Sequence, residues 1–261
     1  MNEIEKILND FYNLYDEDSR LIRDKAHTIE YLTTTRYIEK YLKEGDRILE
    51  VGAGTGRYSL NYAAKGYQVD SVELVEKNLN ILKSKVVDNM NISAVQGNAL
   101  DLNMYSDNTF DITLILGPLY HLYDEVDIKK AISEALRVTK KGGKIFIAYI
   151  TDDAVVLSYG VRKKNLGRLK EICDENWKVP KLKEEIFSSF TIEEFDKVIE
   201  KYNVNKLETI ATDGIAPNIR EYINELNEGE FQLFLDYHFK TCNRKDLMGY
   251  SCHILEIIEK I

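Results

Sequence analysis

The sequence predicts a doubly wound α/β fold: a seven-stranded, mostly parallel sheet with helices on both faces and a helical lid insertion. The first observation is the alternation of strand and helix patterns between residues 47 and 150. Such alternation is typical of βαβ units, whose strands run parallel. The second observation is the run Asp-Ile-Thr-Leu-Ile-Leu at residues 111–116. It is apolar over nearly its whole length, as expected of a central strand that is buried on both faces.

The elements follow in order from apolar periodicity and from glycine stops. Residues 1–45 repeat apolar side chains at helical spacing, in two runs separated by a polar break. We expect strands at 47–51, 68–74, 92–96, 110–116 and 144–150, and helices at 57–65, 75–85 and 128–138. A turn is expected at 141–143, where two glycines follow a lysine.

The strand and helix rhythm ends after residue 150. Residues 151–205 are rich in Lys and Glu and show no strand pattern, which indicates helices laid over the sheet. Two further strands are expected at 207–211 and 250–258, on either side of helices at 218–227 and 230–240. We therefore expect a single domain over 1–261, with these parts: an N-terminal helical flap (1–45), a ligand-binding core (46–150), the lid insertion (151–205) and the C-terminal part of the sheet (206–261).

Composition and charge limit the classes of protein to which this chain can belong. The formal net charge of the 261-residue chain is −9, which argues against a nucleic-acid-binding surface because such surfaces depend on Lys and Arg. Cys173, Cys242 and Cys252 lack metal-site spacing and are expected to be reduced thiols. The sequence shows no secretory signal pattern and no apolar stretch near the ~20 residues of a membrane span. A soluble, cytoplasmic protein is expected, and its oligomeric state stays open.

The strongest local signal is the turn Glu50-Val-Gly-Ala-Gly-Thr-Gly56, directly after the first strand. Glycines there let the backbone approach a ligand closely. The spacing is G-x-G-x-G, with Arg57 where a dinucleotide fingerprint has its last glycine, and it is not a phosphate-binding P-loop. Glu50 would repel a pyrophosphate and suits an amino group. Glu73, seventeen residues after Gly56 at the end of the next strand, suits the two hydroxyls of a ribose.

These segments, taken in order, resemble the motif series of the class I S-adenosylmethionine (SAM)-dependent methyltransferases, of bacterial small-molecule type. The segments are the glycine turn, Val72-Glu73-Leu74, Gln96-Gly97-Asn98-Ala99, Phe110-Asp111-Ile112 and Leu136-Arg137-Val138 with Gly142-Gly143. The resemblance covers about residues 45–150. It implies SAM as the cofactor and, with a closing antiparallel hairpin, the sheet order 3-2-1-4-5-7-6.

The resemblance also implies roles for single residues. Gly52, Ala53, Gly54 and Gly56, together with Glu50, would line the methionine side of SAM. Glu73, next to Leu74, would hold the ribose. Asn98 and Ala99 would meet the adenine, while Leu116 and Gly117 would lie beneath the cofactor. Asn98 departs from the usual acidic residue, but its amide oxygen can still accept from the adenine amine. Lys141 replaces the usual proline, which costs only some turn rigidity.

The N-terminal segment is a candidate cover for the cofactor. Tyr15 is expected over the sulfonium and Arg20 against a carboxylate. The alternative, which stays open, is an ordinary amphipathic helix end.

Residues 117–122 are the candidate substrate loop, because ligands bind beyond the carboxyl ends of parallel strands. Tyr120 and His121 are the candidate substrate contacts, and His121 is the candidate general base. Alternatively, both side chains only pack the loop beneath the lid. His238, Cys242, Arg244 and His253 are expected to form a structural polar cluster without a metal.

The predicted reaction is transfer of a methyl group from SAM to an N, O or S atom of a small molecule, by in-line displacement. Such a transfer needs positioning and exclusion of water more than any fixed catalytic residue. The alternatives are an RNA or protein methyltransferase, a SAM-binding module without catalysis and, more distantly, a nicotinamide dehydrogenase.

Overall fold

The structure is a computed structural model that describes residues 3–182 and 186–261. The predicted flap includes residues 1–2 and the predicted lid insertion includes residues 183–185. These five positions lie outside the described residues.

The core is one sheet of seven strands in the order β3-β2-β1-β4-β5-β7-β6. Strand β7 pairs antiparallel with both β5 and β6, and the other neighbours run parallel. The predicted fold class and sheet order are confirmed. The strands are β1 Arg47–Val51, β2 Gln68–Glu73, β3 Ile92–Gln96, β4 Phe110–Ile115, β5 Thr139–Ile150, β6 Val204–Ala211 and β7 His253–Lys260.

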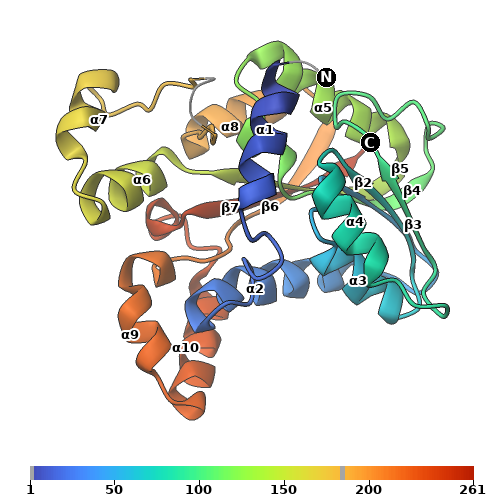
Figure 1. Cartoon of the computed structure of the whole chain (residues 1–261), viewed down its shortest axis with the longest axis horizontal. Coiled ribbons are helices and arrows are strands. Elements are labelled where there is room, and N and C mark those ends of the chain that lie inside the picture. Colours follow the sequence, from blue (N-terminus) through green and yellow to red (C-terminus); the bar gives the residue numbers. More distant parts are fainter. Residues whose placement is uncertain (1–2, 183–185) are drawn as a thin grey trace.

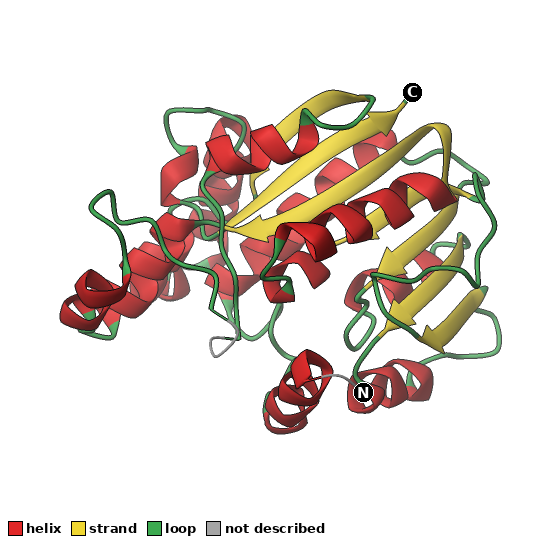
Figure 2. Cartoon of the chain, turned by 90° about the horizontal axis from the view of Figure 1, so that it is seen from above, coloured by secondary structure: helices red, strands yellow, loops and turns green. Residues whose placement is uncertain are grey.

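Helices lie on both faces of the sheet (Figure 2). Buried side chains of α2 and α3 pack on one face, and those of α5 and α8 pack on the other. The longer helices are α1 Glu3–Leu14, α2 Lys25–Tyr41, α3 Arg57–Ala64, α4 Glu76–Ser84, α5 Glu125–Val138, α8 Ile192–Ile199 and α10 Glu228–Thr241. The shorter ones are α6 Asp152–Val155, the π-helix η2 Val156–Arg162, α7 Leu166–Ile172 and α9 Arg220–Glu225, with 3-10 turns η1 Pro118–His121, η3 Ala216–Ile219 and η4 Met248–Tyr250.

Most predicted bounds agree with the structure to within a residue or two, and the larger differences have local causes. Helix α5 begins three residues early because the Asp124 side chain accepts from the backbone amide of Asp127 and caps the helix. The turn expected at 141–143 lies inside β5, where the register against β4 shifts and Gly142 has φ +75°. Strand β7 begins three residues late because residues 248–250 form η4.

The two segments that were predicted to cover the sheet, the N-terminal flap and the lid insertion, each have a part that packs in the core and a part that does not. In the N-terminal part, α2 belongs to the core, since Ile29 and Ile38 are fully buried. The part before α2 has few buried side chains, Leu8 and Leu21 among them, and we call residues 3–24 the α1 segment. In the predicted lid, α8 packs on the sheet through Phe195 and Ile199, whereas α7 projects away from it (Figure 1).

Within residues 3–182 and 186–261, no helix combines the length and the apolar character that crossing a membrane requires.

Candidate functional site

The glycine turn joins β1 to α3 at the carboxyl ends of the parallel strands. Gly52, Gly54 and Gly56 have φ of +73°, +55° and +84°, a region that side chains other than glycine rarely adopt. A Cβ on Gly52 would lie 2.7 Å from the Pro118 ring, and one on Gly56 would lie 2.6 Å from Leu82. The outer glycines are thus required by close packing. A Cβ on Gly54 would meet only the Glu17 side chain, at 3.5 Å.

Glu73 holds this turn from the end of β2. One carboxylate oxygen accepts from the amide of Gly54 at 2.7 Å, and the other accepts from the amide of Val75 at 2.8 Å. The residue is 5% exposed, and burial raises the pKa of its carboxyl group. The carboxylate lies at the predicted place, beside the turn. The hydroxyls of a ribose would compete with, or add to, these two backbone donors.

Glu50 lies beneath the turn at the end of β1. Its Oε2 accepts from the amide of Ser59 at 2.8 Å and also from the Ser59 hydroxyl. Only 2% of the residue is exposed, and burial raises the pKa of the carboxyl group to about 8. Glu50 is therefore mostly protonated at neutral pH unless a cation lies beside it.

The α1 segment covers the turn from the outside. Asp18 accepts from the Thr55 hydroxyl at 2.9 Å and pairs with Lys85, and its carbonyl accepts from Arg57 at 3.0 Å. Lys77 of α4 donates to three backbone carbonyls at the end of α1, at 3.0–3.2 Å. These contacts attach the α1 segment to both sides of the turn.

The two residues predicted to act from this segment have partners within the chain. Tyr15 stacks on Phe11 at 5.3 Å between ring centroids, and its hydroxyl accepts from Arg23 at 3.3 Å. Arg20 donates to Glu17 at 3.0 Å and to both carboxylate oxygens of Glu30 at 3.0 and 3.1 Å. Arg20 thus pairs with two carboxylates of this chain, and its predicted contact with the carboxylate of a ligand stays a prediction.

The predicted substrate loop forms η1, and its histidine has both ring nitrogens engaged. Nδ1 of His121 lies 2.8 Å from the carbonyl oxygen of Ile186, which can only accept. Nε2 therefore accepts from the hydroxyl of Tyr12 at 2.9 Å. Burial lowers the pKa of His121 to about 4. To act as a base, His121 would first have to lose the hydrogen bond from the Tyr12 hydroxyl, or would have to receive the proton by way of that hydroxyl.

The remaining predicted positions lie at the same edge of the sheet. Asn98 is engaged locally: its amide oxygen accepts from the amide of Leu100 at 3.0 Å, and its amide nitrogen donates to Glu5 at 3.2 Å. Gly117 packs beside the Gly52 carbonyl. Leu116 and Ala53 are buried, Ala99 packs against the core, and the Leu74 carbonyl accepts from Gln96.

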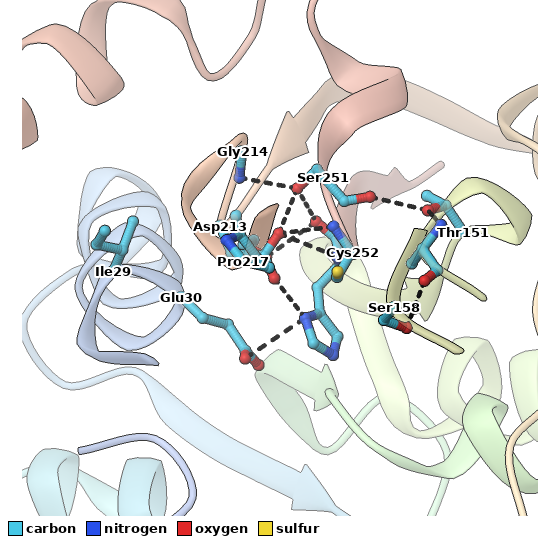
Figure 3. A network of polar contacts seen from close by, with 12 residues as sticks. Ile29, Glu30, Thr151, Ser158, Asp213, Gly214, Pro217, Ser251 and Cys252 are labelled. Carbon is cyan, nitrogen blue, oxygen red and sulfur yellow. Dashed lines mark hydrogen bonds and ion pairs between the residues drawn. The ribbon is translucent and has the colours of Figure 1, made fainter. Parts of the chain in front are cut away.

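Sequence reasoning missed a second group of polar residues at this edge, Glu30, Asp213 and His253 (Figure 3). Nδ1 of His253 is 2.7 Å from Oδ2 of Asp213 and 3.5 Å from Oε2 of Glu30. The three ligand atoms lie within 4.8 Å of one another, a spacing that a metal ion could use. The 2.7 Å separation is nevertheless that of a hydrogen-bonded His–Asp pair. No spacing rule finds residues this far apart along the chain.

The four residues predicted to form a polar cluster hydrogen-bond to different partners. His238 contacts Thr33 at 2.9 Å and Cys242 contacts Tyr37 at 3.4 Å, both beneath the sheet edge. Arg244 pairs with Asp246 at the surface. Three of the four are structural, as expected, while His253 stands apart with Asp213.

Comparison with known proteins agrees with the fold. Residues 49–147 match the family model of a methyltransferase domain. A demethylmenaquinone methyltransferase of Clavibacter sepedonicus is 28% identical over 156 residues, 59% of this chain and 61% of that protein. One from Renibacterium salmoninarum is 38% identical over 104 residues, 40% of this chain and 41% of that protein. The chain thus spans about two fifths to three fifths of these relatives' length.

Two solved structures share the fold over nearly the whole chain. A Pyrococcus horikoshii protein superposes with a TM-score of 0.61, at 15% identity, over 97% of this chain and 99% of that one. A Thermotoga maritima protein, described as a SAM-dependent methyltransferase and possible histamine N-methyltransferase, has a TM-score of 0.58 at 20% identity, over 99% of this chain and 100% of that one. With the sheet order and the glycine turn, these findings show that residues 49–147 form a methyltransferase domain and that the chain has the fold of SAM-dependent methyltransferases.

Proposed function

We propose that this protein transfers the methyl group of SAM to an N, O or S atom of a small-molecule acceptor, by in-line displacement, and releases S-adenosylhomocysteine. The observation that carries the proposal is the glycine turn at the carboxyl ends of the strands, flanked by the buried carboxyl groups of Glu50 and Glu73. It lies within the stretch that matches the methyltransferase domain.

The groups around the turn fit SAM. SAM supplies an electrophilic methyl group on a sulfonium, and the chain has to bind and orient it. The carboxyl group of buried Glu50 would face the α-amino group of SAM. Burial raises the pKa of this carboxyl group, and the positive charge of the amino group would favour its ionised form. Glu73 offers two acceptor oxygens to the ribose hydroxyls. Asn98 and Ala99 would contact the adenine, and Gly52, Ala53, Gly54, Gly56, Leu74, Leu116 and Gly117 would supply backbone and packing contacts. Tyr15 would lie near the sulfonium.

A small acceptor is supported by the cover over this edge. The Tyr12 hydroxyl on α1 donates to His121 of η1, which in turn donates to the Ile186 carbonyl between α7 and α8 of the lid. Three separate segments therefore meet above the strand ends, and a cover of this kind would suit a small acceptor. The net charge of −9 also disfavours RNA as the acceptor. Demethylmenaquinone, the acceptor named for two relatives, is itself a small molecule.

Binding of SAM is the first test. Calorimetry should show one SAM site per chain, and Glu73→Ala should weaken binding at least 10-fold, because a charge-assisted hydrogen bond to a ribose contributes about 1.5–3 kcal/mol. Glu76→Ala, an exposed carboxylate three residues later, is the matched control and should leave the affinity unchanged. Binding of NAD in place of SAM would overturn the proposal.

Methyl transfer is the second test. The protein is incubated with SAM that carries a trideuterated methyl group and with a metabolite extract below 1 kDa in size, and products that have gained CD3 are sought by mass spectrometry. The proposal expects a labelled small molecule and S-adenosylhomocysteine in equal amounts. Label found only in added RNA or protein, or SAM binding with no transfer to any acceptor, would contradict it.

A further inference from the structure

His253 is held in one orientation by a fully buried carboxylate. Asp213 follows β6 and is 3% exposed; its Oδ1 accepts from the Ser251 hydroxyl at 2.6 Å and from the amides of Cys252 and His253 at 2.9 and 3.2 Å. Its Oδ2 is left for the His253 ring, at 2.7 Å (Figure 3). Since a carboxylate can only accept, Nδ1 of His253 is the donor and carries a hydrogen.

The other ring nitrogen of His253 is open. Among residues 3–182 and 186–261, none hydrogen-bonds to its Nε2, and the side chain keeps 20% of its surface exposed. In the neutral ring with Nδ1–H, Nε2 carries a lone pair and is the basic atom. His121, by contrast, has both nitrogens engaged and a pKa lowered by burial to about 4. His253 is thus the histidine whose basic atom is available at this edge.

The Tyr120 phenol supplies a second, independent observation beside His253. Tyr120 is 6% exposed, and its hydroxyl is buried without a hydrogen-bond partner among the described residues. Its ring centroid is 5.8 Å from that of His253. Tyr120 lies in η1, directly after β4, whereas His253 begins β7 opposite Ile150 at the end of β5. A buried hydroxyl without a partner costs free energy, which a bound ligand would recover.

Negative charge dominates the surroundings of His253. Glu30 of α2 and Asp213 after β6 face the ring, and Arg20 pairs with both Glu30 and Glu17. Burial lowers the pKa of His253, but Glu30 and Asp213 outweigh it and raise the pKa above its usual value. Three carboxylates around one guanidinium favour a cationic ligand.

We propose that Glu30, Asp213, His253 and Tyr120 form the acceptor subsite for a protonated amine, with His253 as the base that removes its proton. The proposal rests on the methyl-transfer function and narrows its acceptor to nitrogen. His253 Nε2 takes a proton from R–NH3⁺ and leaves R–NH2. The nitrogen lone pair then forms a bond to the methyl carbon as the S–C bond breaks, which gives R–NH2⁺–CH3 and S-adenosylhomocysteine. His253 finally returns its proton to water.

An amine fits this charge better than an oxygen or sulfur acceptor does. A phenol or thiol would become an anion between Glu30 and Asp213 before methyl transfer, which like charges oppose. An amine begins as a cation and ends as a cation, so the carboxylates favour both substrate and product. The Tyr120 hydroxyl can accept a hydrogen bond from the amine or donate one to a substituent on it. Asp213 is a positioning residue, because its hydrogen bond fixes the tautomer of His253.

The test uses CD3-labelled SAM with a bacterial metabolite extract that is divided by cation exchange into a retained, amine-containing fraction and a flow-through. The wild-type protein should label a compound of the retained fraction. His253→Gln should lower that rate by about 10²–10⁴-fold, the usual contribution of a general base, while SAM affinity is unchanged. The loss should shrink as pH rises, because the free amine then forms without the base. His27→Gln, which removes a similar 2.7 Å His–Asp pair on α2, is the control and should keep full activity.

Asp213→Asn tests the positioning role. Asn keeps an acceptor oxygen for the backbone amides but presents N–H to His253, which favours the tautomer with the hydrogen on Nε2 and removes the base. The ¹⁵N shifts of the His253 ring should report this change in a protein with native thermal stability. An unchanged tautomer with lost activity would overturn the assignment.

The outcomes separate the two proposals. Label only in the flow-through would overturn the amine subsite and leave methyl transfer standing. No label in either fraction, with SAM bound, would overturn methyl transfer to small molecules and the subsite with it. Activity that a chelator abolishes and Zn²⁺ restores would mean that Glu30, Asp213 and His253 are metal ligands. That result would also overturn the proposal, because a metal-bound His253 could not act as the base.

Discussion

Glu50 and Glu73 show at the scale of single residues how burial changes what a sequence position can do. Both stand at strand ends beside the glycine turn, and burial raises the pKa of both carboxyl groups. A buried carboxyl group close to neutrality responds strongly to a neighbouring cation, because the cation repays the cost of ionisation. The two residues can therefore couple ligand binding to proton release.

Binding of SAM should release a proton from Glu50. At about pH 6.5 the α-amino group of SAM is charged and Glu50, with a pKa of about 8, is protonated. An ammonium group beside it lowers this pKa, so the carboxyl proton leaves. Calorimetry in buffers of different ionisation enthalpy should give a release that approaches one proton per SAM. Glu50→Gln should release none, and an equal release from both proteins would place the amino group elsewhere.

Gly52 should be the least replaceable glycine of the turn. Alanine there carries the strain of φ +73°, about 1–2 kcal/mol, and a Cβ 2.7 Å from Pro118, which adds about 1–3 kcal/mol of overpacking. Gly66→Ala is the matched control, because it has φ +90° and open space around the Cβ position. Urea unfolding should show the larger loss for Gly52→Ala. Equal losses would mean that Pro118 moves away freely.

At the scale of elements, α1 is the helix whose place depends most on polar contacts. Its segment is attached by Lys77 to three carbonyls, by Asp18 to Thr55 and Lys85, and by Tyr12 to His121. Among residues 4–14 of α1 only Leu8 is buried, whereas α2 and α5 bury apolar side chains over several turns. An element with little buried apolar surface is expected to open first.

Lys77→Met should loosen the α1 segment and leave the sheet unaffected. The substitution keeps the length of the side chain and removes the donor to the three carbonyls of residues 12, 13 and 15. Hydrogen exchange should accelerate over residues 3–24 and stay unchanged in β1 and β4. Lys83→Met, an exposed lysine on the same helix, should change neither. Unchanged exchange in the Lys77 variant would show that other contacts hold the segment.

At the scale of the whole molecule, three groups with raised pKa values make stability depend on pH. Burial raises the pKa of Glu50 to about 8 and that of Glu256 to about 7, and the carboxylates around His253 raise its pKa as well. Each group binds a proton in the folded state at a pH where the unfolded chain has already released it. Folding is therefore favoured at lower pH.

The free energy of unfolding should fall as pH rises from about 7.5 to 9. Above about pH 7.5 the unfolded histidines and carboxyl groups are deprotonated, so the histidines whose folded-state pKa is lowered no longer contribute, and the raised pKa values all act in the same direction. Urea unfolding at several pH values measures the slope, and Glu50→Gln should reduce it most. A stability that rises over this interval would contradict these shifts.

The sequence predicted the elements because apolar periodicity and glycine stops are local properties. Strands β1 and β3 have the predicted bounds, since short apolar runs between turns leave little choice. Glu50, Glu73 and the glycines were predicted as site residues because they lie within 24 residues of one another, around one turn. The sheet order came from the resemblance to a family, since periodicity does not say which strands become neighbours.

The tertiary structure alone decided which distant side chains meet. Glu30, Asp213 and His253 come together because β7 returns antiparallel beside β5, which brings the ends of β6 and β7 next to α2. In the same way, packing of the α1 segment on the sheet edge placed Tyr12 against His121, a contact that the sequence did not predict. Contacts between residues 40 or more positions apart, such as these, depend on the closed fold, and no local pattern encodes them. The sequence thus determined the fold class and the cofactor turn, while the sheet order and helix packing determined the polar groups that face an acceptor.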